Sequence, residues 1–188
     1  MNATLDLFKE SGALLEGHFR LSSGLHSNGY LQSALVLQHP ALAGRLGAAL
    51  AELVRPHAPT AVLSPALGGI VIGHEVARAL DVRAIFAERQ DGKLSLRRGF
   101  TLGPDDRLVV IEDVVTTGGS TRETIDVATS HGATVSAAGS IIDRSGGQSS
   151  LGVPYHALVS LALPTWQEAE CPLCAQGIPA IKPGSRFK

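Results

Sequence analysis

Apolar residues along the chain follow two patterns: short continuous runs, which predict strands, and helical spacing, which predicts helices. The two patterns alternate along the sequence. Short apolar runs predict strands at residues 61–63, 83–86, 108–111, 135–142 and 157–161, and the run at 108–111 is mainly β-branched. Apolar residues at helical spacing predict helices at 41–54, 70–80 and 120–131, and Leu5, Phe8, Leu14 and Leu15 predict a short amphipathic helix near the amino end. Because strands alternate with helices, the predicted fold class is α/β, with a mostly parallel central sheet flanked by helices.

The composition indicates one domain spanning residues 1–188, with 44% hydrophobic and 18% charged residues. A net charge of −1 gives no overall attraction to polyanions, so we expect neither nucleic acid nor a membrane as partner. The first 16 residues lack the basic start and apolar core of a secretory signal, and no apolar stretch approaches membrane-spanning length. With only two cysteines, no disulfide framework is possible, and we expect a cytoplasmic protein.

The two cysteines, Cys171 and Cys174, have the spacing of a zinc or redox pair. No second cysteine pair or His-x-His set accompanies them in the tail, so free thiols are the favoured interpretation. Metal binding shared across a dimer and a local disulfide are the alternatives. We therefore predict no protein metal ligand.

The most informative segment follows the apolar run 108–111, where two acids precede a turn of small residues that opens a helix. Ligands bind at the carboxyl ends of parallel strands, which puts Glu112 and Asp113 at the mouth of a site. The hydroxyls and backbone N–H groups of the turn, at the positive end of a helix, predict a phosphate cradle. The residues of this cradle are Val114, Val115, Thr116, Thr117, Gly118, Gly119, Ser120 and Thr121.

The cradle matches neither a Walker A loop nor a dinucleotide fingerprint. Carboxylates would repel a phosphate but accept hydrogen bonds from vicinal hydroxyls or help hold a hydrated Mg²⁺, which favours a sugar phosphate as ligand. The alternative is a solvated strand end with an N-capped helix.

Two further segments lie near the same edge of the predicted sheet. Gly68 and Gly69 form a second turn from strand to helix and a second candidate for anion binding. Residues 88–98 carry a strong hairpin-turn signal at Asp91-Gly92 and four basic side chains. This hairpin is either an exposed, solvated element or a mobile basic loop that closes on an anionic ligand.

The segment from Val109 to Thr121 resembles the motif with which type I phosphoribosyltransferases bind 5-phosphoribosyl-1-diphosphate. The resemblance implies that Glu112 and Asp113 hold the ribose hydroxyls, that Thr116 to Thr121 wrap the 5′-phosphate, and that the turn at Gly68 and Gly69 receives the diphosphate. It also implies Mg²⁺ as cofactor, held mainly by the substrate.

Residues 19–31 resemble the hood segment of the orotate phosphoribosyltransferases, and residues 178–186 resemble the tail of one branch. The resemblance implies a hood of about residues 1–35 plus the tail, over a core of about 40–163. The implied contacts with orotate come from Ser23, Gly24, Tyr30, Leu31, Thr116 and Arg144. The Arg144 guanidinium would grip the orotate carboxylate, the alternative being a surface salt bridge to Asp143.

Arg89 and Lys93 match the catalytic loop of these enzymes, which implies a homodimer whose loop reaches the neighbouring subunit's site. Gln90 and Ser95 depart from that loop, so its contacts pass to Arg97 or Arg98. Ser22 and Gly68 stand where many members carry lysine.

The resulting expectation is transfer of 5-phosphoribosyl to orotate, giving orotidine 5′-monophosphate and diphosphate in pyrimidine (UMP) biosynthesis. The alternatives are a purine or uracil phosphoribosyltransferase and a non-catalytic nucleotide- or RNA-binding regulator on the same fold.

Overall fold

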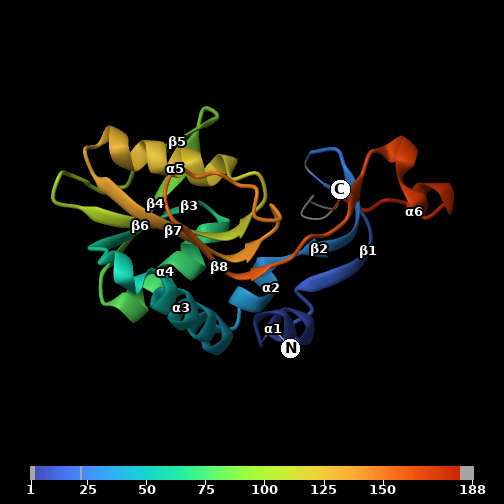
Figure 1. Cartoon of the computed structure of the whole chain (residues 1–188), viewed down its shortest axis with the longest axis horizontal. Coiled ribbons are helices and arrows are strands. Elements are labelled where there is room, and N and C mark those ends of the chain that lie inside the picture. The colour runs from blue at the N-terminus through green and yellow to red at the C-terminus, as the bar shows by residue number, and fades with distance from the viewer. Residues whose placement is uncertain (1–2, 22, 183–188) are drawn as a thin grey trace.

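The computed structural model describes residues 3–21 and 23–182, which form a large α/β part and a smaller part beside it (Figure 1). The α-helices are α1 (Ala3–Glu10), α2 (Ser33–Leu37), α3 (Pro40–Val54), α4 (Gly68–Leu80), α5 (Gly119–Ser130) and α6 (Pro172–Ala175). The strands are β1 (Leu14–Arg20), β2 (His26–Leu31), β3 (Ala61–Pro65), β4 (Arg83–Gln90), β5 (Lys93–Leu96), β6 (Arg107–Val115), β7 (Thr134–Asp143), β8 (Tyr155–Ser160) and β9 (Thr165–Trp166). Two 3₁₀ turns are η1 (Arg55–His57) and η2 (Glu168–Glu170).

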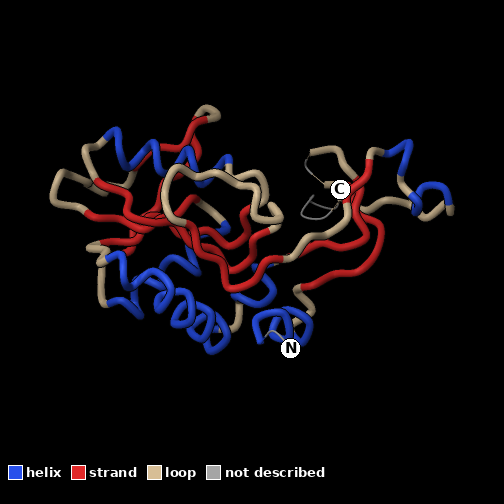
Figure 2. The backbone as a smooth tube through the Cα atoms, viewed as in Figure 1, coloured by secondary structure: helices blue, strands red, loops and turns tan. Residues whose placement is uncertain are grey.

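The large part is built on a six-stranded sheet with the order β5-β4-β3-β6-β7-β8. All its neighbouring strands are parallel except the edge strand β5, which pairs antiparallel with β4. Helices α3 and α4 cover one face and α5 covers the other, as Figures 1 and 2 show. Residues 61–63 of β3 and 108–111 of β6 are fully buried, which explains their uninterrupted apolar sequence. The predicted fold class is confirmed.

The smaller part, which we call the hood, consists of the antiparallel sheet β1-β2-β9 and residues 167–182 (Figure 1). Its two-residue strand β9 joins β2, and a further bridge pairs Phe19 with Ile181, so that the tail runs beside β1. None of the helices in the part of the chain that the structure describes is long and apolar enough to cross a membrane.

The predicted helix near the amino end is partly wrong, because α1 ends at Glu10 and Leu14 and Leu15 belong to β1. The Ser11 hydroxyl donates to the Leu7 carbonyl oxygen, and Gly12 takes a positive φ of 67°, which is easy only for glycine. Leu14 and Leu15 then pair with Leu31 and Tyr30 in the hairpin. Tertiary pairing has therefore overridden the helical spacing of these leucines.

Strand β6 is longer than predicted and changes how the two acids are placed. It continues to Val115, with Glu112 opposite Ser140 and Val115 opposite Asp143 on β7. Glu112 and Asp113 therefore belong to the final residues of the strand rather than following it, because two more β-branched residues extend the pairing. The acids still lie at its carboxyl end.

The hairpin predicted at Asp91-Gly92 is confirmed by the antiparallel pairing of β4 with β5. Asp91 and Gly92 have φ values of 50° and 83°, and two positive φ angles match the right-handed twist of the flanking strands. The hairpin projects from the edge of the sheet (Figure 1).

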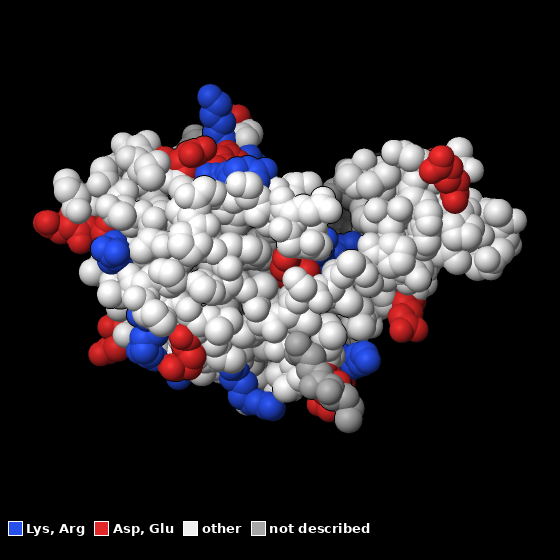
Figure 3. Space-filling view, viewed as in Figure 1, with Lys and Arg blue, Asp and Glu red and all other residues white. Residues whose placement is uncertain are grey.

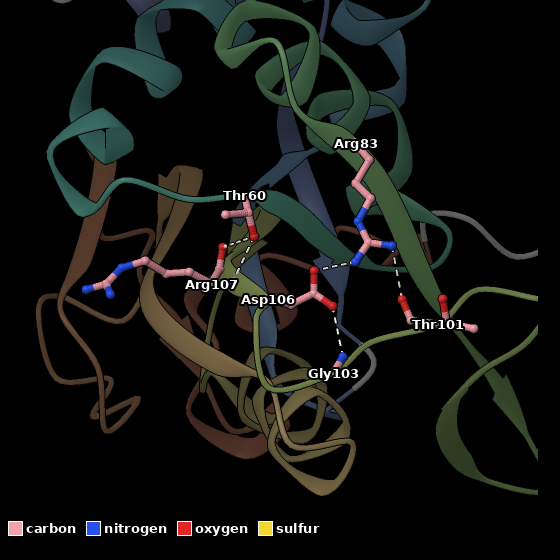
Figure 4. Close-up of polar contacts among 6 residues, drawn as sticks. All are labelled: Thr60, Arg83, Thr101, Gly103, Asp106 and Arg107. Carbon is pink, nitrogen blue, oxygen red and sulfur yellow. Dashed lines mark hydrogen bonds and ion pairs between the residues drawn. The ribbon is translucent and has the colours of Figure 1, made fainter.

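Hydrogen bonds and an ion pair link the loops to the strand starts at the amino-terminal edge of the sheet (Figure 4). Arg83, at the start of β4, pairs with Asp106 and donates to the Thr101 carbonyl oxygen at 3.1 Å, while the Gly103 N–H donates to the Asp106 carboxylate at 2.8 Å. Thr60 and Arg107 bond to each other just before β3 and at the start of β6. These contacts fix the connections at that edge, whereas ligands of parallel sheets bind at the opposite, carboxyl-terminal edge.

Candidate active site

The turn between β6 and α5 forms a small cavity lined by backbone and hydroxyl groups. Its volume is about 80 Å³, and it is lined by Glu112, Val114, Val115, Thr116, Thr117, Gly118, Gly119, Ser120 and Thr121. Gly118 takes a φ of 75° at the start of the helix, and a Cβ there would lie 2.6 Å from the Leu151 side chain. The positive end of α5 and the residues of the turn thus line one pocket, which suits a phosphate.

Glu112 is buried beside Asp113 at the end of β6. Only 8% of Glu112 is exposed, and the Asp113 N–H donates to its carboxylate at 3.2 Å. Burial, together with the adjacent Asp113 carboxylate, raises the pKa of Glu112 to about 9. In the unliganded protein the Glu112 carboxyl is therefore protonated at neutral pH, while Asp113 lines the larger cleft described next.

A cleft of about 500 Å³ lies between the hood and the carboxyl-terminal edge of the large sheet. Its lining includes eight residues that the sequence singled out: Ser23, Tyr30, Leu31, Asp113, Val114, Thr116, Thr117 and Arg144. The sequence assigned no role to the other lining residues, which are Arg20, Leu21, Leu25, Gln32, Leu163, Thr165 and Lys182. These come from the hood and from connections to it, and only the packing of hood against core brings them to the cleft. Val114, Thr116 and Thr117 line both cavities, so the cleft and the phosphate cradle adjoin.

The turn at Gly68 and Gly69 packs directly against the acid pair. A Cβ on Gly68 would lie 2.6 Å from an oxygen of the Asp113 carboxylate, and one on Gly69 would lie 2.9 Å from the Ile111 carbonyl oxygen. At Gly69 the clash would be with backbone, which favours glycine there, whereas at Gly68 it would be with the end of the Asp113 side chain. A side chain at position 68, such as the lysine of many members, would have to displace the Asp113 carboxylate, whereas Ser22 lies outside the described residues.

Arg144 lies just after β7 and lines the cleft. Its backbone N–H donates to the Val115 carbonyl oxygen at 2.8 Å, while its side-chain Nε is buried without a hydrogen-bond partner among the described residues. Burial lowers the pKa of this guanidinium. A desolvated cation in a cleft is a ready partner for an anionic ligand.

The alternative interpretation of Arg144, a salt bridge to Asp143, is wrong for the described part of the chain. The Asp143 carboxylate instead accepts hydrogen bonds from the Ser145 N–H at 2.8 Å, the Ser145 hydroxyl at 2.6 Å and the Ser160 hydroxyl at 3.0 Å. Asp143 therefore stabilises the loop after β7, and the Arg144 side chain remains available to a ligand in the cleft.

The basic hairpin lies against α5 and away from both cavities of its own chain. Arg89 pairs with Glu123 on α5 at 2.7 Å, and the Leu94 N–H donates to the same carboxylate at 2.6 Å. Arg98 pairs with Glu88 at 2.7 Å. Neither Arg89 nor Lys93 lines the cleft or the cradle.

The cysteine pair of the tail has close histidine neighbours in the folded chain. The side chains of His18 and His26, from the hood hairpin, lie beside Cys171 and Cys174, and one ligand atom from each of the four falls within 4.8 Å of the others. The sequence suggested an isolated pair because both histidines lie about 150 residues upstream.

Comparison with known proteins identifies the family. Residues 33–171 match the sequence model of the phosphoribosyl transferase domain. Orotate phosphoribosyltransferase of Heliobacterium modesticaldum is 56% identical over 184 residues, covering 97% of this chain and 96% of the relative, and that of Carboxydothermus hydrogenoformans is 53% identical over 182 residues, covering 96% and 95%. The crystal structure of orotate phosphoribosyltransferase from Aeropyrum pernix superposes with a TM-score of 0.70 at 28% identity, covering 83% of this chain and 92% of that one.

Fold, cradle and sequence match together define a phosphoribosyltransferase, and the chain belongs to that family. Within the family it belongs to the orotate phosphoribosyltransferases, because the relatives of that name match it over nearly its whole length.

Proposed function

We propose that this chain transfers the 5-phosphoribosyl group from 5-phosphoribosyl-1-diphosphate to N1 of orotate, giving orotidine 5′-monophosphate and diphosphate in UMP biosynthesis. The observation that carries the proposal is the buried, unpartnered Nε of Arg144 in a cleft that adjoins an anion cradle. Relatives named orotate phosphoribosyltransferase at 53–56% identity support it.

In the cradle, the backbone N–H groups and hydroxyls of residues 116–121 bind the 5′-phosphate of the sugar. Glu112 and Asp113 accept hydrogen bonds from the two ribose hydroxyls, at the end of β6 above the cradle. The turn at Gly68 and Gly69, which approaches Asp113 closely, receives the diphosphate.

In the cleft, the guanidinium of Arg144 binds the orotate carboxylate through two parallel hydrogen bonds. Tyr30 and Leu31 pack beside the pyrimidine ring, and Thr116 contacts its edge from the cradle side. Ser23 and Gly24 present backbone groups to the ring. A carboxylate contact of this kind selects orotate over uracil by charge.

The reaction breaks the bond between C1′ and the diphosphate oxygen, whose electron pair leaves with the diphosphate. N1 of orotate gives up its proton to solvent and forms the new bond to C1′. Positive charge develops on the ribose ring and negative charge on the leaving group, so fixed donors and nearby carboxylates supply most of the catalysis. The oxygen donors present fit Mg²⁺, since Asp113 faces the cleft, and the ion, held mainly by the substrate, would neutralise the diphosphate.

Arg89 and Lys93 bind the leaving diphosphate in the site of the neighbouring subunit of a homodimer. Their hairpin projects from the sheet edge, and neither side chain lines the cleft of its own chain, which favours action across an interface. The Arg89–Glu123 pair holds the hairpin against α5 in the free protein and exchanges for the diphosphate when the hairpin closes.

The alternatives predict different ligands. A purine or uracil phosphoribosyltransferase would use the cradle without needing Arg144. A regulator that binds RNA would require a continuous basic surface, whereas Lys and Arg are interspersed with Asp and Glu on the face of the molecule seen in Figure 3.

The decisive experiment follows orotate by ultraviolet absorbance with purified protein, Mg²⁺ and 5-phosphoribosyl-1-diphosphate, beside uracil, hypoxanthine, adenine and xanthine. Mg²⁺-dependent loss of orotate alone would support the proposal. Turnover of another base would retain the cradle and reject the role of Arg144, and binding of the sugar diphosphate without turnover of any base would favour the regulator.

A further inference from the structure

The hood contains a cluster of two imidazoles and two thiols that the proposed reaction does not use. His18 comes from β1, His26 from β2, and Cys171 and Cys174 flank Pro172-Leu173 at the start of α6. His18, His26 and Cys171 are buried and Cys174 is half-buried. We propose that these four side chains bind one Zn²⁺ ion, which anchors the C-terminal segment to the hood hairpin.

The distances between the four ligand atoms are close to those of a tetrahedral zinc site. His18 Nε2 lies 2.8 Å from His26 Nδ1 and 3.4 Å from Cys171 Sγ, and Cys174 Sγ lies 3.3 Å from His26 Nδ1 and 3.8 Å from His18 Nε2. Zinc bonds of about 2.0–2.1 Å to nitrogen and about 2.3 Å to sulfur place tetrahedral ligands roughly 3.3 Å apart for two nitrogens and roughly 3.6 Å apart for nitrogen and sulfur. Shifts of about half an ångström would complete the site.

The orientation of His18 is already set for metal binding. Its Nδ1 lies 2.6 Å from the Ile178 carbonyl oxygen, which can only accept, so Nδ1 carries the proton and Nε2 presents its lone pair to the cluster. Ligating histidines in metal sites are commonly oriented by such a bond from the other ring nitrogen to a carbonyl. The backbone of the tail therefore positions one ligand while Cys171 and Cys174 supply two others.

A β-bulge brings the two histidines to the same side of the hairpin. The register changes from Glu16 opposite Gly29 to Phe19 opposite Ser27, so β1 carries one extra residue in the interval that includes His18. Without this bulge, His18 would lie opposite Ser27, and alternation would direct His18 and His26 to opposite faces. The bulge therefore places the side chains of His18 and His26 on the face of the hairpin where the cluster lies.

The C-terminal segment is held to the hood mainly by backbone hydrogen bonds, through β9 and the bridge at Ile181, and buries few apolar side chains. Of residues 161–182, Cys171 alone is buried, so this part of the described chain has almost no apolar core. Small elements of this kind are commonly stabilised by a structural metal, because binding energy replaces the missing hydrophobic burial. Four protein ligands leave no open position, which indicates a structural ion rather than a catalytic one.

The same segment reaches the substrate cleft. The Arg20 N–H donates to the Ile181 carbonyl oxygen at 2.9 Å, and both Arg20 and the adjacent Lys182 line the cleft. Loss of zinc should therefore loosen the hood side of the cleft. This consequence for catalysis rests on the proposed function, whereas zinc binding itself does not.

Elemental analysis of untagged protein, grown with zinc and purified without chelator, is the primary test. We expect about one zinc per chain, and replacement by Co²⁺ should give the ligand-field bands of a tetrahedral site together with a thiolate charge-transfer band. Cys174→Ser and His26→Asn should each reduce the bound metal severalfold. His57→Asn is the matched control, because it removes a histidine that also lies 2.8 Å from another, His156, but has no thiol beside it.

Wild-type protein that contains no zinc and binds neither added Zn²⁺ nor Co²⁺ would overturn the site, and this outcome does not depend on activity or on the folding of a variant. The anchoring role is tested with metal-free protein, prepared with chelator and reductant and assayed after Mg²⁺ is restored. We expect faster proteolysis of residues 167–182 and a KM for orotate raised roughly tenfold, since displacing binding groups by about 1 Å can cost up to about 10²-fold. Unchanged proteolysis and KM after complete loss of zinc would overturn the anchoring role.

Discussion

Replacing Glu112 by glutamine should stabilise the protein at alkaline pH while weakening its substrate site. In the folded chain the pKa of Glu112 is raised from 4.5 to about 9 by burial and by the Asp113 carboxylate beside it. The unfolded chain releases this proton near the ordinary pKa. Between those two values the folded state holds more protons than the unfolded state, so the free energy of unfolding decreases as pH rises.

The magnitude follows from the interval between the two pKa values. At pH 8 the unfolded glutamate lies about 3.5 pH units above its pKa, which corresponds to a loss of about 4.8 kcal/mol relative to acidic pH. Water in the adjoining cleft screens the Glu112 charge and reduces this destabilisation, so we expect a loss of about 2 kcal/mol in the free energy of unfolding. Glu112→Gln abolishes the titration and keeps an amide donor next to Asp113. The variant should therefore exceed the wild type only slightly near pH 5, just above the unfolded pKa, and by ~2 kcal/mol at pH 8, or about 4–8 °C in Tm.

Urea denaturation at pH 5, 6.5 and 8 measures this difference, with Glu16→Gln as control because Glu16 is an exposed carboxylate on β1. The control should leave the pH dependence unchanged. Parallel curves for Glu112→Gln and the wild type at all three pH values would refute the idea that a buried, neutral Glu112 limits stability.

Three other substitutions test the site. Arg144→Ala should raise the KM for orotate about 10–100-fold, as expected for a lost charge-assisted hydrogen bond, with the KM for the sugar diphosphate unchanged; parallel increases in both would contradict it. Lys93→Ala should lower kcat about 10²–10³-fold. Mixing this variant with Arg144→Ala should restore activity, because each hybrid dimer contains one site with both residues intact. Failure to recover activity would exclude action across subunits. Gly68→Ala should push against Asp113 and weaken sugar-diphosphate binding, while Gly103→Ala, where a Cβ meets open space, should not; equal effects would discount the contact.

Local pattern was sufficient for much of the large sheet and for the phosphate cradle. The strands and helices between residues 41 and 160 follow the predicted order, because β-branched runs and helical spacing express preferences that the buried sheet reinforces. The cradle was predictable for the same reason, since its ligand groups are consecutive along the chain from Glu112 to Thr121.

Prediction from local pattern was less successful at the amino end. Leu14 and Leu15 have helical spacing with Phe8, yet they pair in β1, because the partner strand and the positive φ of Gly12 decide the conformation there. The same hairpin contains the bulge near His18, which no sequence pattern predicted.

The sequence by itself determined the fold class, the order of the core elements and the residues of the cradle, since each depends on neighbours a few positions apart. Only the tertiary structure decided the raised pKa of Glu112, the buried Nε of Arg144 that has no partner among the described residues, and the gathering of His18 and His26 with the cysteine pair. Burial and contacts between distant segments set these properties, because desolvation and ligand geometry depend on the packing of hood against core and of the tail against the hairpin.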